Sequence, residues 1–251
     1  MVAIVIAATV LRASSVVGGL TVDVDGQGLE PLLPADELQT ALLSEFPGLT
    51  ACRVRDVKVK DIERFLAANP YVETVHATVS VGGRIVTHAR LRRPVVRVFH
   101  NGSDFYADAS GHCFPVRPAH SCDVIVASGM FRQTPTGDIT KLDLAAPPAD
   151  SAGAAYDMVK VWELAKYLDT HGLSILYDQI YIDAAGDIVL QPKLGDYEVV
   201  IGDSHRLDEK FKSLKTFYAK GLPHAGYQSY SRVSVKYKGE VVCRRRNAGQ
   251  H

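Results

Sequence analysis

The order of secondary-structure signals between Leu20 and Arg92 restricts the fold of this chain more than any other feature. Residues 20–26 alternate apolar and polar side chains, which is the period of a half-buried strand. Four more elements follow: a helix opened by Pro34 and ended by Pro47-Gly48, a helix with the apolar stripe Val59, Ile62, Phe65 and Leu66, and one strand on each side of Gly82-Gly83. Asn69-Pro70 ends the second helix, because a proline disfavours helical backbone in the residue before it. The order strand, helix, helix, strand, strand predicts a small α+β module.

The two strands around Gly82-Gly83 must each gather their apolar side chains on one face. The apolar positions are Val75, Ala77, Val79 and Val81 on the first strand and Ile85, Thr87, Ala89 and Leu91 on the second. We expect Val81 to lie opposite Ile85, with a bulged three-residue loop at Gly82-Gly83-Arg84. A two-residue loop would mix the two faces.

A second block, from Pro94 to Arg246, is richer in strand signals. The predicted strands cover residues 95–100, 105–108, 123–128, 175–183, 188–193, 197–202, 230–237 and 240–246. Apolar stripes predict helices over 154–169 and 208–220, the second capped by Gly221. This block, residues 93–246, is therefore expected to be a mostly antiparallel β domain with two helices. Arg92-Arg93-Pro94 joins it directly to the first block, residues 20–92, since Pro94 restricts Arg93 to extended backbone.

The start of the chain is apolar: Val2–Leu11 carries no charge, and Arg12 ends the run. A helix of that length covers about 15 Å, which is half of a bilayer core. A signal peptide would need a basic start, which is absent, and a buried strand is a further alternative. We favour the end of a membrane helix. Residues 1–19 are then a partial transmembrane segment, with the remainder of the chain outside the cytoplasm.

Composition and motifs exclude several classes of function. The chain has 28 basic and 28 acidic residues, so it lacks the positive charge of a nucleic-acid-coating protein. With 47% apolar and 22% charged residues it has the composition of a folded protein. Phosphate-loop, zinc-protease and nucleophile-elbow motifs are absent from the sequence. We therefore expect no catalytic residue, no cofactor, no small-molecule substrate and no nucleic-acid partner.

One cluster could hold a zinc ion: His112, Cys113, His120 and Cys122. His112 and Cys113 are adjacent, however, and on a strand they would point to opposite faces. The alternatives are free thiols or a Cys113–Cys122 disulfide in an oxidising compartment. We expect no metal site, and the state of the thiols stays open at this point.

Four carboxylates have positions that a turn already explains. Asp183 and Asp187 flank a turn, and Asp104 and Asp108 lie near strand ends. A catalytic role for any of them is the weaker hypothesis, because acids at turns bond to the backbone.

A series of motifs resembles one known family, that of the cell-division proteins FtsQ and DivIB. The first is Asn69-Pro70-Tyr71-Val72-Glu73, which is followed by a hairpin that leads into Arg93-Pro94 and resembles the end of the POTRA module of that family. The others, in the order of the family, are residues 105–111, 125–129, 179–182, 190–196, 209–218, 230–233 and 241–243. The resemblance covers about residues 20–246. We expect residues 247–251 to form a disordered tail.

The resemblance implies a single-pass inner-membrane protein whose periplasmic part comprises a POTRA domain and a β domain. Such proteins have no catalytic activity. They bind other division proteins, notably FtsB and FtsL, and help to recruit and regulate septal peptidoglycan synthesis. Two alternatives remain: a POTRA-containing component of a translocation system, and a zinc-dependent periplasmic enzyme built on the His/Cys cluster. The first usually has tandem POTRA repeats and a β-barrel signature, which this sequence lacks.

The expected partner site is the last strand of the sheet. Tyr230–Tyr237 and Glu240–Arg246 flank Lys238-Gly239, which is typical of a hairpin turn. An unpaired edge can accept a strand from another chain, and FtsQ-type proteins receive FtsB on their last strand. The expected site residues are Tyr237, Glu240, Val241, Val242, Cys243, Arg244, Arg245 and Arg246. Alternatively, Arg244–Arg246 only protect the edge from aggregation. We expect Val242→Pro to remove a donor from the edge and to weaken partner binding.

Overall fold

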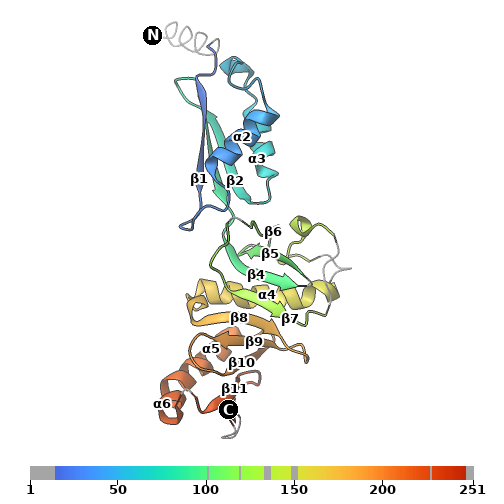
Figure 1. Cartoon of the computed structure of the whole chain (residues 1–251), viewed down its shortest axis with the longest axis vertical. Helices are drawn as coiled ribbons and strands as arrows, with labels where there is room; N and C mark the ends of the chain where they lie inside the picture. Colours follow the sequence, from blue (N-terminus) through green and yellow to red (C-terminus); the bar gives the residue numbers. More distant parts are fainter. Residues whose placement is uncertain are drawn as a thin grey trace. The chain divides into compact units, whose positions relative to one another are not determined.

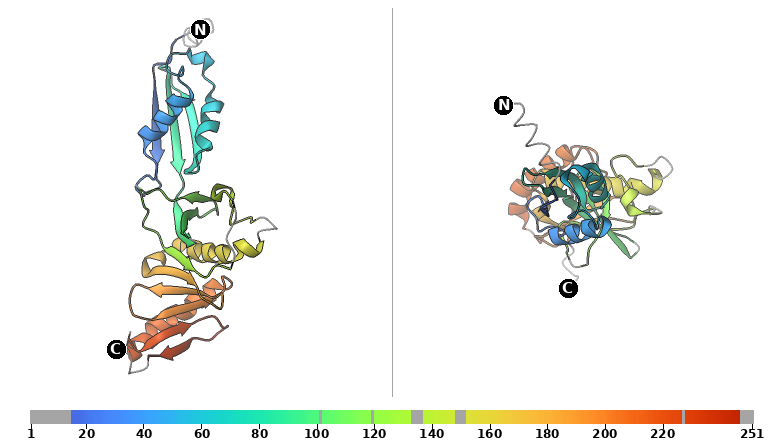
Figure 2. Two further views of the ribbon diagram at one scale, coloured as in Figure 1. Left: turned by 45° about the vertical axis from the view of Figure 1, so that its right-hand side comes forward. Right: turned by 90° about the horizontal axis from the view of Figure 1, so that it is seen from above.

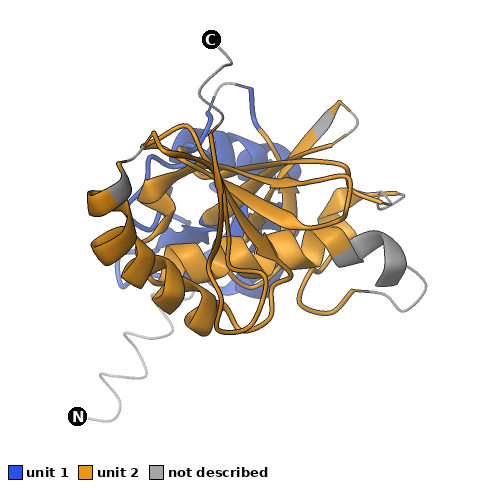
Figure 3. Ribbon diagram, turned by 90° about the horizontal axis from the view of Figure 1, so that it is seen from below, with its two compact units in different colours: residues 1–93, 117–122 blue, residues 94–116, 123–251 orange. Residues whose placement is uncertain are grey.

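The chain divides into two compact units in a computed structural model, which describes residues 15–100, 102–118, 120–132, 137–147, 152–226 and 228–246. Unit 1 comprises residues 1–93 with 117–122, and unit 2 comprises residues 94–116 with 123–251 (Figure 3). The first boundary falls between Arg93 and Pro94. Strand β3 ends two residues before it and strand β4 begins at it.

Unit 1 has the order of elements that the sequence predicts (Figure 1). The elements are β1 (Gly19–Asp25), α2 (Ala35–Glu45), α3 (Val59–Ala67), β2 (Val72–Val79) and β3 (Arg84–Leu91). The sheet order is β1-β3-β2, with β1 parallel and β2 antiparallel to β3. Leu38 and Leu42 of α2 and Ile62 and Leu66 of α3 are buried against Ile85 of β3. Both helices therefore cover one face of this sheet (Figure 2).

The β2–β3 hairpin keeps the predicted faces but shifts the predicted pairing by two residues. Val79, not Val81, pairs with Ile85, and Val81 is 84% exposed at the turn. The loop is Val81-Gly82-Gly83, because Ser80 still donates to Arg84 and Gly83 takes a φ of 75°. The register irregularity lies at the other end of the hairpin, between Val72 and Thr74. A shift by two preserves the faces, so the apolar pattern alone could not detect it.

The boundary of the expected membrane segment needs correction. Residues 1–14 lie outside the described residues, but Val17 is buried in the unit 1 core and donates to the Cys52 carbonyl. Gly18 donates to Gly83, and β1 begins at Gly19. Residues 15–19 therefore belong to unit 1 and not to a transmembrane helix. Among the described residues, no helix combines the length and the apolar character that crossing a bilayer requires.

Unit 2 is built on one mixed sheet of nine strands in the order β12-β11-β10-β9-β8-β7-β4-β5-β6. The strands are β4 (Pro94–His100), β5 (Ser103–Asp108), β6 (Cys113–Pro115), β7 (Val126–Gly129), β8 (Tyr177–Ile182), β9 (Ile188–Pro192), β10 (Glu198–Gly202), β11 (Tyr230–Ser234) and β12 (Val242–Arg245). Most neighbours are antiparallel, but β4–β7, β7–β8 and β10–β11 are parallel. The sequence does not predict β6, because its three residues are too few to show the alternation of apolar and polar side chains that indicates a strand.

Two helices cover one face of this sheet. They are α4 (Ala152–Thr170) and α5 (Leu207–Thr216). Alternate residues of the central strands, such as Ile180, Leu190 and Val199, share one buried cluster with Met158 of α4 and Leu214 of α5. The residues next to these on each strand, such as Gln179, Gln191 and Glu198, point to the opposite face, which is partly polar.

The helix expected over 208–220 is longer and ends elsewhere. After α5 it continues through a wide turn, Phe217–Gly221, into α6 (Leu222–Ala225). Gly221 has a helical φ of −85° and is not the C-cap. A side chain at this position would press on the Phe217 ring, 2.8 Å away, so the glycine serves close packing. Gly226, at a φ of 84°, ends the helix.

Candidate functional site

The eight residues expected to form the partner site do not all lie on one strand. Val242, Cys243, Arg244 and Arg245 form β12, and Arg246 follows it. The connection that precedes the strand holds Tyr237, Glu240 and Val241. The predicted turn at Lys238-Gly239 forms, because Glu240 donates to the Tyr237 carbonyl, but the predicted strands beside it are too long, since β11 ends at Ser234 and β12 begins at Val242. After Ser234 the chain stays with β10, since Val235 donates to the Val200 carbonyl and Lys236 bonds Asp187. This detour, residues 235–241, separates the two strands, and the chain pairs with β11 again only from Val242 onward.

Strand β12 lies at the end of the sheet, and no described strand pairs with its other side. The backbone N–H of Arg246 donates to the Ser229 carbonyl, and the Arg244 carbonyl accepts from the Ser231 hydroxyl. The backbone polar groups of Arg244 and Arg246 therefore face β11. Antiparallel pairs alternate between bonded and non-bonded, and Val242 opposite Ser234 is therefore also turned toward β11. The outward backbone groups belong to Cys243 and Arg245. Val242→Pro would thus remove an internal bond and is not the variant that blocks the edge.

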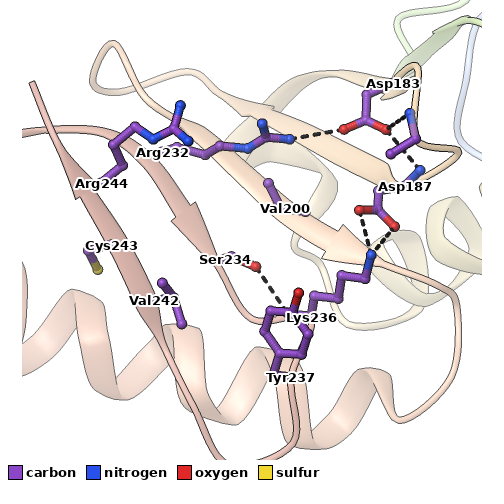
Figure 4. A pocket seen from close by; sticks show the side chains of 11 residues that line it. Asp183, Asp187, Val200, Arg232, Ser234, Lys236, Tyr237, Val242, Cys243 and Arg244 are labelled. Carbon is purple, nitrogen blue, oxygen red and sulfur yellow. Dashed lines mark hydrogen bonds and ion pairs between the residues drawn. The ribbon is translucent and has the colours of Figure 1, made fainter.

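The side chains of β12 divide between the two faces of the sheet. Val241 and Cys243 pack against the core, and burial raises the pKa of the Cys243 thiol. Val242 and Arg244 point to the polar face, where they border a pocket of about 520 Å³ together with Val200, Arg232 and Lys236 (Figure 4).

An ion cluster forms the wall of this pocket. Arg232 of β11 lies 3.0 Å from an oxygen of Asp183 and 3.8 Å from one of Glu198. Lys236 Nζ lies 2.8 Å from both carboxylate oxygens of Asp187 (Figure 4). The cluster fixes the β8–β9 turn to β11, which is 49 residues away along the chain.

Arg244 differs from these cations because its charge is not compensated. It pairs directly with Arg232 across β11–β12, and like charges in such a position repel. Arg232 is neutralised by Asp183 and Glu198, whereas the exposed Arg244 guanidinium makes no ion pair with any described residue. The edge therefore presents a cation that is available to an acidic group.

Two of the four carboxylates, Asp108 and Asp183, serve the backbone as the sequence indicates, whereas Asp187 binds Lys236 and Asp104 binds Arg97. Asp108 accepts bonds from the backbone of Ser110 and His112, and Asp183 accepts from Ala185 and Asp187. Burial alone would raise the pKa of Asp183. The backbone donors of Asp187 and Ala185 and the Arg232 guanidinium outweigh it and lower the pKa.

This pKa predicts a loss of stability in acid. A carboxyl whose pKa is lower in the folded than in the unfolded chain stabilises the fold above the unfolded pKa of about 3.9, and this contribution disappears as the pH falls through the folded value. We expect the free energy of unfolding to fall less steeply below about pH 4 in Asp183→Asn than in the native chain. Urea titrations followed by Trp162 fluorescence measure it, because this single tryptophan is buried in unit 2. Asp178→Asn, an exposed change on β8, is the control, and equal acid slopes in both variants would disprove the effect.

The His/Cys cluster is not assembled. Cys113 is buried in the unit 2 core while His112 is exposed, and burial raises the pKa of the Cys113 thiol. His120 and Cys122 belong to unit 1, where Arg117 of the same segment bonds the Leu32 carbonyl and Glu37. The four cysteines are free, so the Cys113–Cys122 disulfide is wrong for this structure. No group of three metal-ligating side chains occurs among the described residues.

Sequence reasoning missed the basic half of the ion cluster, Arg232 and Lys236. The signal was present, because polar Arg232, Ser234 and Lys236 alternate with buried Val233 and Val235. This alternation indicates a strand with one polar face, but it does not predict which carboxylates bind the basic side chains.

An open sheet edge with outward backbone donors and a free cation is a surface for protein recognition by strand addition. The family model described as FtsQ/DivIB, C-terminal related, matches residues 93–244, which is more than half of the 251 residues. The chain belongs to the FtsQ/DivIB family, whose members are generally non-enzymatic, membrane-associated division proteins. No curated protein matches the chain.

Proposed function

We propose that this chain is a non-enzymatic scaffold of the division machinery that binds FtsB- and FtsL-type proteins through β12. The free edge carries this proposal, because it combines the outward backbone groups of Cys243 and Arg245 with the uncompensated charge of Arg244. Main-chain bonds would supply affinity and Arg244 would select an acidic partner segment. Through these partners the protein helps to recruit and regulate septal peptidoglycan synthesis.

The proposal includes a membrane tether. The apolar run Val2–Leu11 and the membrane association of the family support an inner-membrane protein with unit 1, as a POTRA domain, and unit 2 in the periplasm. Reporter fusions at His251 of the full native reading frame test this topology. Activity of a periplasmic reporter is the expected result, and activity of a cytoplasmic reporter alone would reject it.

Reversal of the Arg244 charge tests the acidic character of the partner. We expect Arg244→Glu to weaken binding of the extracytoplasmic segment of an FtsB-type protein from the same organism about tenfold, mainly through slower association. The fold should tolerate the change, because the introduced carboxylate would face Arg232 and replace a repulsive cross-strand pair by an attractive one.

Surface plasmon resonance at two salt concentrations measures this effect. Lys238→Glu, an exposed change in the preceding turn, is the control for net charge. Screening at high salt should reduce the difference between Arg244→Glu and the native chain. Equal losses in the two variants would mean that only net charge matters, and that Arg244 has no specific role.

A further inference from the structure

A second hollow in unit 2, of about 430 Å³, is apolar. Its main lining residues are Ile175, Leu176, Pro192, Leu194, Tyr218 and Leu222. Ile175, Leu176 and Leu194 are 70%, 47% and 75% exposed. Single exposed apolar side chains are normal on a protein surface, but three around one hollow form a patch of the kind that partners cover.

The hollow is preformed. Lys193 donates its backbone N–H to the Leu176 carbonyl over 2.9 Å, which holds the turn 174–176 beside the end of β9. Leu222 and the ring of Tyr177 are buried beneath it. A ligand that enters would therefore find ordered walls and lose little free energy to their rearrangement.

The hollow continues the edge at the C-terminal end of β12. Arg246 bonds Asp196, in the turn that also carries Leu194 and Tyr197. On β11, Tyr230 pairs with Arg245, and its ring lies 5.7 Å from that of Phe217, the neighbour of Tyr218. A strand added to β12 would thus end at the same end of the sheet as the hollow, with β12 and β11 between them, so the residues that flank this strand would have to reach across these two strands.

One unpaired cation lies at the rim of the hollow, and a second lies at the end of β12. Lys193 lines the hollow and Arg245 is the last residue of β12, and both are exposed and make no ion pair with any described residue. Asp196, the acid nearest in sequence to Leu194, is bound by Arg246. An occupant with acidic groups beside its apolar side chains matches this rim.

We propose that the hollow binds apolar side chains of the same partner segment that adds a strand to β12, from the acidic, amphipathic residues that flank this strand at its Arg245 end. This inference rests on the proposed function. It extends the docking surface from a strand, which is recognised by its backbone, to an apolar anchor, which is recognised by its side chains. Buried apolar anchors dominate the energy of many interfaces.

The test uses the full chain and a fluorescent probe, the extracytoplasmic segment of an FtsB-type protein from the same organism, with affinity read by anisotropy. We expect Leu194→Glu and Ile175→Glu each to weaken binding about tenfold or more. Met130→Glu, at a residue of unit 2 that is 66% exposed and does not line the hollow, should bind like the native chain. Trp162 fluorescence verifies that each variant is folded.

Cys243→Pro in parallel separates this inference from the proposed function. If it abolishes binding while Leu194→Glu and Ile175→Glu bind normally, the edge is correct and the hollow is not a contact. If the hollow variants lose binding and Cys243→Pro does not, strand addition is wrong, and so is the continuity between the edge and the hollow. A native chain that does not bind the probe overturns both. A native dimer that Leu194→Glu converts to a monomer in light scattering would assign the hollow to a second copy and overturn the inference.

Discussion

Cys243→Pro is expected to weaken binding of the FtsB-type segment by at least about tenfold while β11 and β12 stay paired. The Cys243 backbone points away from β11, so proline removes a donor that only an incoming strand would use. A net main-chain bond contributes about 1 kcal/mol, and about 1.4 kcal/mol is tenfold in affinity. The proline ring also occupies the space of the incoming backbone, which adds to the loss.

Two matched variants separate the loss of the outward donor from other effects of the substitution. Val242→Pro removes a donor that faces β11, so it should lower the stability of unit 2 and detach β12. Cys243→Ala keeps the backbone donor and removes the thiol, so it should bind like the native chain. Hydrogen exchange of β11 amides and titration calorimetry with the FtsB-type segment measure the two effects. Undiminished binding by folded Cys243→Pro would mean that β12 does not accept a strand.

The sequence predicts unit 1 well because its elements are local. Each helix has its own stripe and its own stop, and buried Ile62 and Leu66 lie on the predicted stripe of α3. The hairpin register was wrong by two residues because Val79 and Val81 are both apolar and share a face. Only the geometry of Gly83 selects between them.

The sequence predicts the existence of the edge strand but not its length. The detour after Ser234 depends on the Lys236–Asp187 pair and on Gly202, where any side chain would meet the Lys236 stem 2.7 Å away. These are contacts between strands that are distant along the chain, and no local propensity encodes them. The same holds for the hollow, whose walls come from three separate segments.

Gly129→Ala is expected to destabilise unit 2 by about 3 kcal/mol or more, because two costs add. Gly129 ends β7 beside Ile182 of β8, and its φ of 118° is one that side chains disfavour. A Cβ there would lie 2.4 Å from the Ile182 carbonyl oxygen, a backbone atom that cannot rotate away. This conflict gives a physical reason for glycine at the end of the 125–129 motif.

Gly137→Ala separates the two costs. Gly137 has a similar φ of 109°, but a Cβ there meets nothing within 4 Å, so we expect only the strain of about 1–2 kcal/mol. Urea unfolding followed by Trp162 fluorescence gives both values from the same unit. The difference between the variants measures the collision with β8. If Gly129→Ala loses no more than Gly137→Ala, the strands separate at little cost, and the close approach of β7 and β8 does not explain this glycine.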